Sequence, residues 1–445
     1  MAKYPIRDYL MRSEALHAVP HLTTALNGPL QLIESHLLAQ QVQIEHWLRH
    51  QWLTTPAPFY ASVDLRNSGF KLAPVDTNLF PAGFNNLNPA FLPLCIHAVQ
   101  TAIERTCPRA ANILIIPENH TRNLFYLESL ATLRDIVRKA GFAVRIGSLL
   151  PGLEQPLDVI LPSKRSLQLE PIRRNDERIS VDGFTPCMVL LNNDLSAGRP
   201  SLLEGLAQPV LPPLSLGWAN RLKSDHFEHY KQVVAEFSSL IDIDPWLIDP
   251  LFRRCGEINF MQREGEDCLA TNVDALLGAI RRKYDEYGIE KQPFVVVKAD
   301  AGTYGMGVMS VYSGSEMREL NRKERTRMAA VKGGQAVSKV IMQEGVYTFE
   351  TLGEAGNEAV AEPVVYMINH YVVGGFYRVH KNRGTDENLN APGMHFEPLA
   401  FAESCTSPDQ TQEPDASPNR FYAYGVIARL ALVAAARELQ AVASS

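Results

Sequence analysis

The segment that most constrains this chain is residues 294–307, Phe-Val-Val-Val-Lys-Ala-Asp-Ala-Gly-Thr-Tyr-Gly-Met-Gly. It begins as an apolar run typical of a buried strand, which ends at Lys298 shortly before Gly302, Gly305 and Gly307. Glycines let backbone N–H groups approach phosphate oxygens closely, and a lysine at the strand end adds a positive charge for the same oxygens. The segment therefore predicts a phosphate-binding loop, although a β-hairpin with glycine turns would explain it about as well on its own.

Two common nucleotide-binding motifs are excluded for this segment. A Walker loop requires Gly-Lys-Ser/Thr, which is missing. A dinucleotide-binding turn requires a different glycine spacing and a following helix. A phosphate loop of another kind remains.

Composition narrows the class of protein. The chain has 445 residues, which suggests roughly three domain-sized units. Hydrophobic residues make up 46% and charged residues 21%, values that are ordinary for a globular protein. The net charge is −6 and no block of Lys or Arg occurs, which argues against a nucleic-acid partner. A nucleotide would therefore be held by a few isolated Lys and Arg residues.

Cysteine usage and the chain ends favour the cytoplasm. The six cysteines form no Cys-x-x-Cys pair and no zinc pattern, so we expect reduced, mostly buried thiols. The N-terminus has no long apolar core, and we expect no signal peptide. The apolar residues 421–442 include Arg429, Arg437 and Glu438, which favours a packed helix over a membrane span.

Two strand-rich units are expected along the chain. The first is an open α/β layer, with strands at 112–117, 142–146 and 188–191 and a helix at 123–140. Such sheets bind ligands at the carboxyl ends of their strands. The second unit has strands at 294–297, 308–312, 337–343, 359–368 and 371–377.

The neighbours of the glycine loop give it a context. Residues 340–346 form an apolar strand with a polar end, Lys223 opens a charged helix, Arg378 lies on a strand, and Asn388 follows. This succession resembles the ATP-grasp superfamily, in which a nucleotide lies between two α+β lobes. The resemblance implies roles for three groups: Lys223, Lys298, Gly302, Thr303, Tyr304, Gly305, Met306 and Gly307 at the ATP phosphates; Gln343, Glu344 and Val346 at the adenine; and Lys298, Arg378 and Asn388 as catalytic residues at the transferred phosphoryl group.

The acidic metal ligands of that superfamily follow the arginine strand, but here the matching pattern lies upstream. Strands at 59–65 and 70–75 form a hairpin that carries Asp64 and then Asp76-x-Asn78. Carboxylate and amide oxygens are ligands that suit Mg²⁺, and acidic residues on facing strands repel unless a cation lies between them. We therefore favour a metal site at Asp64, Asp76 and Asn78 over an acidic surface hairpin.

This motif order predicts a circularly permuted ATP-grasp fold. The hairpin comes first in sequence but is expected beside the Lys298 lobe, with the N-terminal helix or helix 421–442 packed behind it. A Rossmann-like substrate domain is expected to precede the ATP-binding lobes. The expected segments are N-terminal helices at 1–58, the metal hairpin at 59–95, the α/β substrate domain at 96–216, a helical small lobe at 217–290, the ATP-grasp core at 291–402, and an acidic linker with a C-terminal helix at 403–445.

Substrate residues are sought among polar clusters beside the hairpin and after strands. An arginine can grip a carboxylate with two hydrogen bonds, and a helix N-terminus favours an anion. Capping and turn chemistry also explains each cluster, and only Arg66, Asn119 and Arg122 are favoured beyond that. The full candidate set is Arg66, Asn85, Asn86, Glu118, Asn119, Arg122 and Asn193.

Over most of its length the sequence resembles the proteobacterial glutamate–cysteine ligase family of ATP-grasp type. The matching stretches are 62–86, 117–123, 223–227, 297–307 and 359–392. The resemblance implies synthesis of γ-glutamylcysteine from glutamate and cysteine, the first step of glutathione biosynthesis, with ATP and Mg²⁺ or Mn²⁺. One departure is Asp76, where the superfamily more often has Glu.

Three alternatives stay open at this point. Another ATP-grasp ligase, such as a glutathione synthetase or an amino-acid ligase, would share every motif. A non-catalytic nucleotide-binding protein and a kinase that phosphorylates a small acid are the others. A homo-oligomer is neither required nor excluded by the sequence.

Overall fold

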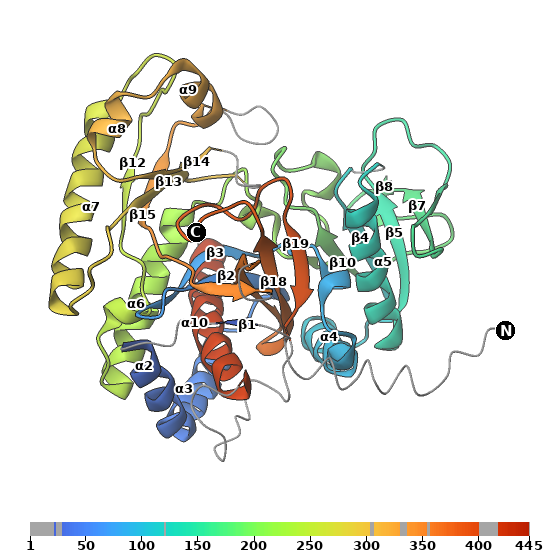
Figure 1. The fold of residues 1–445 in the computed structure, drawn as a ribbon. Coiled ribbons are helices and arrows are strands. Elements are labelled where there is room, and N and C mark those ends of the chain that lie inside the picture. Colours follow the sequence, from blue (N-terminus) through green and yellow to red (C-terminus); the bar gives the residue numbers. More distant parts are fainter. Residues whose placement is uncertain are drawn as a thin grey trace.

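The structure is a computed structural model that describes residues 22–23, 29–119, 122–302, 307–329, 336–353, 357–399 and 417–444. Figure 1 shows three groups of elements: a four-stranded sheet with helix α7 on one side, a seven-stranded sheet with helix α10 in the middle, and a six-stranded sheet with helices α4 and α5 on the other side. The arrangement is mixed α/β with several sheets.

The seven-stranded sheet joins the beginning of the chain to its end. Its main order is β1-β16-β17-β18-β19, and β2 pairs with both β17 and β3, always antiparallel. The early hairpin therefore completes a sheet built mainly from late strands. The strands are β1 (Leu22–Thr23), β2 (Tyr60–Asn67), β3 (Leu72–Asn78), β16 (Glu350–Leu352), β17 (Ala359–Ile368), β18 (Tyr371–His380) and β19 (His395–Pro398).

The four-stranded sheet is antiparallel, in the order β12-β15-β13-β14. It includes the strand that leads into the glycine loop and the strand predicted to face adenine. Its elements are β12 (Phe252–Cys255), β13 (Val295–Ala299), β14 (Val308–Val311) and β15 (Val340–Glu344), with α7 (Glu266–Glu286), α8 (Ser315–Arg318) and α9 (Arg322–Met328).

The six-stranded sheet has the order β11-β10-β4-β5-β7-β6 and is parallel except for the edge strand β6. The predicted strand-helix-strand unit of the α/β layer is confirmed. The elements are α4 (Leu92–Thr106), β4 (Asn112–Pro117), α5 (Leu124–Lys139), β5 (Ala143–Ser148), β6 (Leu157–Ile160), β7 (Ser166–Pro171), β10 (Met188–Asn192) and β11 (Val210–Leu211), with the separate pair β8 (Arg173–Asn175) and β9 (Arg178–Ser180).

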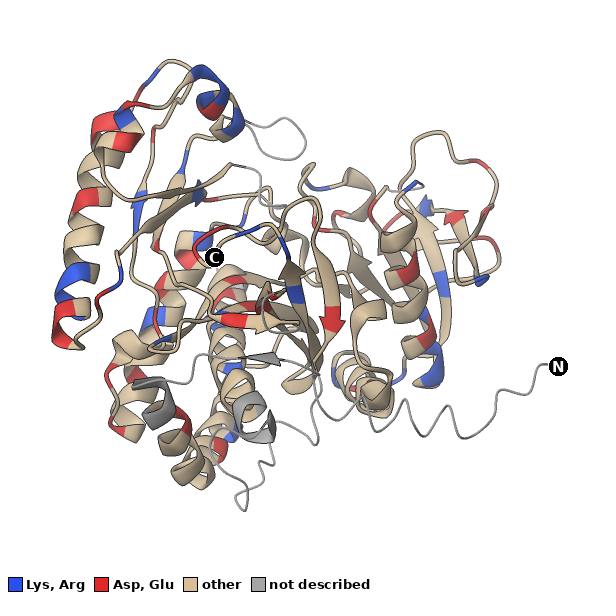
Figure 2. Ribbon diagram, in the orientation of Figure 1, with Lys and Arg blue, Asp and Glu red and all other residues tan. Residues whose placement is uncertain are grey.

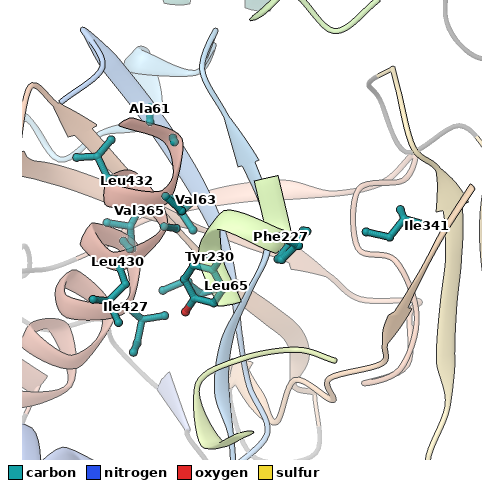
Figure 3. Close-up of a cluster of buried hydrophobic side chains, with 14 of the residues drawn as sticks. Ala61, Val63, Leu65, Phe227, Tyr230, Ile341, Val365, Ile427, Leu430 and Leu432 are labelled. Atoms are coloured by element: carbon teal, nitrogen blue, oxygen red, sulfur yellow. The ribbon is translucent and has the colours of Figure 1, made fainter. Parts of the chain in front are cut away.

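The central core lies behind the β2–β3 hairpin. Successive side chains of a strand point to opposite faces, so Ala61, Val63 and Leu65 share one face of β2. That face packs on α10 (Ser417–Ser444), which contacts β2 and β3 and whose Ile427 and Leu430 belong to the same apolar cluster (Figure 3). The predicted packing of the C-terminal helix behind the hairpin is confirmed.

Further helices complete this core. Helix α6 (Lys223–Ile241) packs along α10, and α2 (Pro29–Ala39) and α3 (Gln41–Thr54) lie against the same helix. Among the described helices, none is long and apolar enough to cross a membrane. Figure 2 shows acidic and basic residues interspersed over the ribbon.

The cysteines differ in part from expectation. The structure pairs Cys255 of β12 with Cys268 of α7 in a disulfide, whereas the sequence predicted reduced thiols throughout. The cause is tertiary, because α7 packs across β12 and brings the two side chains together. Cys95, Cys107 and Cys187 are free thiols. Cys405 and most of the predicted acidic linker lie outside the described residues.

Candidate functional site

The pocket of interest is lined by the four-stranded sheet, the β2–β3 hairpin and strands β17 and β18. Most residues predicted for ATP, metal and catalysis line it together, although they come from distant parts of the chain. Those residues are Asp64, Asp76, Lys223, Lys298, Gly302, Gln343, Glu344, Val346, Arg378 and Asn388, and Arg66 joins them. Thr303, Tyr304, Gly305 and Met306 lie outside the described residues.

The two lysines converge on one wall of the pocket. Lys298 Nζ on β13 donates to the backbone oxygen of Val75 at 2.7 Å and to Gln343 Oε1 at 2.8 Å. Lys223 Nζ, at the start of α6, donates to the backbone oxygen of Gly302 at 2.6 Å. The expectation that the hairpin lies beside Lys298 is confirmed by the contact with Val75.

Burial changes the proton affinity of both lysines. Burial lowers the pKa of Lys223 to about 8, although Asp76 acts in the opposite direction. Burial also lowers the pKa of Lys298, again against the attraction of Asp76. A phosphate group would favour the charged form of each lysine, because it would add negative charge beside them.

Two carboxylates oppose each other on the hairpin. Asp64 and Asp76 are directly paired in the register of β2 and β3. Burial raises the pKa of Asp64 above its ordinary value, with Arg378 opposing the rise. Burial would also raise the pKa of Asp76, but the charges of Lys223 and Lys298 outweigh it and hold that pKa below its ordinary value.

The donor set of the hairpin fits a hard divalent cation through its two carboxylates. Facing carboxylates favour an intervening cation, and oxygen donors suit Mg²⁺. Asn78 does not line the pocket, and its Oδ1 accepts hydrogen bonds from the Phe80 backbone at 2.9 Å and from Trp218 Nε1 at 3.3 Å. The described part of the chain contains no group of three Asp, Glu, His or Cys side chains arranged for a metal, so further ligands would have to come from nucleotide phosphates or water.

Arg378 is held between two acidic side chains. Its Nη1 donates to Asp64 Oδ2 at 2.9 Å and to Glu362 Oε1 at 2.5 Å. Burial would lower the pKa of Arg378, but Asp64 and Glu362 outweigh it and raise that pKa, so the guanidinium stays charged. Glu362 was not predicted from the sequence, although it is an acid inside the otherwise apolar strand 359–368.

Arg66 lines the pocket, and three of its N–H groups donate hydrogen bonds to other residues of the protein. Its Nε donates to Glu362 Oε2 at 3.0 Å, and its Nη atoms donate to the backbone oxygens of Val346 at 3.2 Å and Glu387 at 2.6 Å. These contacts tie the hairpin to the segment after β15 and to the loop after β18. A role for Arg66 in gripping a substrate carboxylate stays a prediction.

The carboxylate of Glu344 is committed to the core. Its side chain is 1% exposed and accepts hydrogen bonds from Lys71 Nζ at 2.8 Å, Trp246 Nε1 at 3.1 Å and the Leu251 backbone at 3.0 Å. Any contact of Glu344 with adenine would therefore come from its backbone. The apolar side chains Val75, Val296, Ala299 and Val308 supply the pocket wall on which a flat base could lie.

The remaining substrate candidates lie away from this pocket. Glu118, Asn119 and Arg122 follow β4, Asn193 follows β10, and Asn85 and Asn86 lie in a short helix after the hairpin. None of them lines the pocket, and Asn193 Nδ2 donates to the Pro117 backbone oxygen at 3.0 Å.

The loop after the hairpin is nevertheless fastened to the carboxyl edge of the six-stranded sheet. Asn192 Nδ2 donates to the Pro81 backbone oxygen at 2.8 Å. Ser129 Oγ on α5 accepts from the backbone N–H groups of Gly83 at 2.7 Å and Phe84 at 3.1 Å. The β2–β3 hairpin and the carboxyl edge of the six-stranded sheet are thus joined by one short segment.

Five further polar residues of the pocket were not predicted from the sequence, and one of them is Ser310 on β14. Besides Glu362, the loop after β18 contributes Asp386, Glu387 and Asn390. Ser310 Oγ on β14 donates to the Asp386 backbone oxygen at 3.0 Å, so this loop spans from the seven-stranded sheet to the four-stranded sheet. The acidic-polar run 386–390 was the visible signal, but only Asn388 was selected from it.

Comparisons with known proteins identify relatives over nearly the whole chain. The GshA family model, described as glutamate-cysteine ligase, matches residues 34–439. A crystal structure from Methylobacillus flagellatus KT, described as a candidate gamma-glutamylcysteine synthetase, is 61% identical with a TM-score of 0.88 and covers 95% of this chain and 99% of that chain.

More distant solved structures align with low similarity. A glutathione synthetase-like effector from Globodera pallida, in its apo form, is 10% identical with a TM-score of 0.37, over 83% of this chain and 80% of that chain. D-alanyl-alanine synthetase A from Vibrio cholerae is 9% identical with a TM-score of 0.31, over 72% and 81%. No curated protein matches the chain.

Proposed function

The chain belongs to the glutamate–cysteine ligase family, and from this premise we propose that its pocket joins the γ-carboxylate of glutamate to the amine of cysteine at the expense of ATP. The products are γ-glutamylcysteine, ADP and phosphate. The observation that carries the site assignment is the meeting of the facing pair Asp64 and Asp76 with Lys298 in one pocket.

The proposed ATP site divides along the pocket. Lys223 and Lys298 hold phosphate oxygens, because both buried lysines now donate to neutral oxygens that a charged acceptor can replace. The apolar wall with Val296 and Val308 takes the adenine. Asp64 and Asp76 would hold Mg²⁺ or Mn²⁺, and the cation would neutralise charge on the phosphoryl oxygens.

The reaction proceeds in two displacements. The glutamate γ-carboxylate attacks the γ-phosphorus of ATP, giving γ-glutamyl phosphate and ADP. The cysteine amine then attacks the acyl carbon, phosphate leaves, and the amine loses a proton. Lys298 and Arg378 stabilise the negative charge that develops on the transferred group, and the glycine loop from Gly302 to Gly307 keeps water from the acyl phosphate.

We propose a circularly permuted ATP-grasp arrangement for the fold around this site. Three features support it: β2 pairs with β17, Val75 of the hairpin contacts Lys298, and α10 packs behind the hairpin. The largely parallel six-stranded sheet is the candidate for the Rossmann-like substrate domain.

A substrate panel read by ADP release tests the function. We expect release only when glutamate, cysteine and Mg-ATP are all present, with γ-glutamylcysteine identified by mass spectrometry. Release with glutamate and glycine but not with cysteine would contradict the assignment. Release without any amine, together with a stable phosphorylated product, would favour a kinase instead.

A further inference from the structure

A carboxylate outside the predicted metal pair occupies the centre of the site. Glu362 lies on β17, opposite Arg378 in the register with β18 and two positions from Val364, which faces Asp64 on β2. Its side chain is only 3% exposed, although it lines the pocket. A buried carboxylate in this position is stable only with positive partners.

Each oxygen of Glu362 accepts a hydrogen bond from a different arginine. Oε2 accepts from Arg66 Nε at 3.0 Å, and Oε1 accepts from Arg378 Nη1 at 2.5 Å. Glu362 therefore fixes two guanidinium groups that come from β2 and β18. Because Arg66 also holds the backbone oxygens of Val346 and Glu387, Glu362 cannot move without disturbing that network.

Arg378 is also in contact with one member of the proposed metal pair. The same Nη1 that donates to Glu362 donates to Asp64 Oδ2 at 2.9 Å. A divalent cation that ligates Asp64 competes with Arg378 for this carboxylate. When the cation takes Asp64, Arg378 needs another anion close by, since an unpaired buried charge is costly.

We propose that Glu362 is a positioning residue that keeps Arg378 beside the reacting phosphoryl group while releasing Asp64 to the divalent cation. This inference rests on the proposed metal hairpin. Glu362 neutralises the charge of Arg378. A cation that binds Asp64 therefore displaces one hydrogen bond of an arginine that keeps Glu362 as its partner, and not the only ion pair of that arginine. Without the Glu362 charge, Arg378 pairs with Asp64 alone and opposes cation entry.

The test is a titration of the nucleotide-free, full-length protein with Mn²⁺ alone, in which free Mn²⁺ is measured by electron paramagnetic resonance. Glu362→Gln keeps the shape of the side chain but removes its charge. We expect the Mn²⁺ affinity to fall about tenfold, an effect typical of coupling between contacting groups. Glu387→Gln is the matched control, because it removes a pocket carboxylate that does not contact Arg378, and we expect a change of less than about threefold.

A double-mutant cycle separates action through Arg378 from a plain loss of negative charge. In an Arg378→Met background the competitor is gone, and we expect Glu362→Gln to change Mn²⁺ affinity by less than about threefold. An equal loss in both backgrounds would overturn the proposal. Circular dichroism and thermal melting of each variant verify that it is folded.

A separate variant, Asp64→Asn, distinguishes failure of this inference from failure of the metal assignment. Asp64→Asn should weaken Mn²⁺ binding whatever Glu362 does. If Asp64→Asn binds Mn²⁺ as the unmodified protein does, the proposed metal pair is wrong. If Asp64→Asn loses affinity but Glu362→Gln does not, only the role of Glu362 is refuted.

Discussion

At the scale of single residues, two lysines of the pocket donate hydrogen bonds to uncharged oxygens. Lys223 donates to a backbone oxygen of Gly302, and Lys298 donates to a backbone oxygen and an amide oxygen. Hydrogen bonds between ionised partners are stronger than those to neutral acceptors. An incoming triphosphate can therefore displace these contacts with a net gain.

The depressed pKa of Lys223 predicts a pH dependence of nucleotide binding. Below about pH 8 the free protein carries the charged ammonium, and above it the charge is lost, so ATP affinity should fall as the pH rises from 7 to above 8. Lys223→Gln should bind ATP about tenfold more weakly at pH 7 and lose most of this pH dependence. Calorimetric titration with ATP across this range checks both expectations.

Lys231 provides the control on the same helix. Its side chain is exposed and does not line the pocket, so Lys231→Gln should keep the pH profile of the unmodified protein. A Lys223→Gln profile that follows the unmodified protein would show that another group causes the pH dependence.

At the scale of elements, helix α10 holds the β2–β3 hairpin through apolar packing and one buried charge cluster. Arg221 Nε and Nη2 donate to Glu438 at 2.7 and 2.9 Å, and Arg221 Nη1 donates to the Thr77 backbone oxygen on β3 at 2.6 Å. His226 Nδ1 lies 3.2 Å from the same carboxylate. The cluster therefore connects α10 and α6 with the strand that carries Asp76.

Glu438→Gln should destabilise the fold by about 3 kcal/mol at pH 7, because it leaves Arg221 buried without its anionic partner. Burial would raise the pKa of Glu438, but Arg221 outweighs it and lowers that pKa from 4.5 to about 2. The contribution of the charged carboxylate is thus complete above pH 4.5 and is lost as the pH falls toward 2. Urea unfolding at pH 7 and at lower pH measures the difference in the free energy of unfolding between Glu438→Gln and the unmodified protein, which should become smaller as the pH falls.

A more exposed ion pair between α10 and α6 is the matched control. Arg437 pairs with Glu236 at 2.6 Å, and the Glu236 side chain is 48% exposed. Glu236→Gln should change the free energy of unfolding by less than about 1 kcal/mol. Equal destabilisation by Glu236→Gln and Glu438→Gln would contradict a special role for the buried cluster.

At the scale of the whole molecule, local patterns predicted elements well but not the contacts that complete the site. The strands at 112–117 and 359–368 were predicted with the bounds they have, because each is an apolar run bounded by turn residues. The hairpin with Asp64 and Asp76 could be predicted because these two acids interrupt short apolar strands. Its place beside Lys298 followed from motif order.

The contacts that could not be predicted are those between residues that lie far apart along the chain or meet only through tertiary packing. Arg66 was expected to meet a substrate, yet its carboxylate partner Glu362 lies 296 positions away along the chain. The engagement of Asn78 by Trp218 and the pairing of Cys255 with Cys268 likewise depend on tertiary packing. No spacing rule encodes such contacts.

The hydrogen bonds between the loop after the hairpin and the six-stranded sheet with its helix α5 predict a variant that affects the amino-acid substrates but not ATP. Ser129→Ala removes the acceptor for the Gly83 and Phe84 N–H groups, which costs about 1–3 kcal/mol if they stay unpaired. We expect kcat/KM for the amino-acid substrates to fall at least about fivefold, while KM for ATP stays unchanged. Steady-state kinetics with each substrate varied in turn measures these constants. A rise in KM for ATP alone would contradict the link between the hairpin loop and the amino-acid substrates.

The most direct test of the account is the formation of γ-glutamylcysteine by Asp76→Ala with glutamate, cysteine and Mg-ATP. Asp76 lies at the meeting point of the hairpin, Lys223 and Lys298, so its loss should lower product formation by about 10³-fold or more. Mass spectrometry of the product and circular dichroism of the variant give the rate and confirm folding. Full activity of a folded Asp76→Ala variant would contradict the assignment of this pocket as the catalytic site.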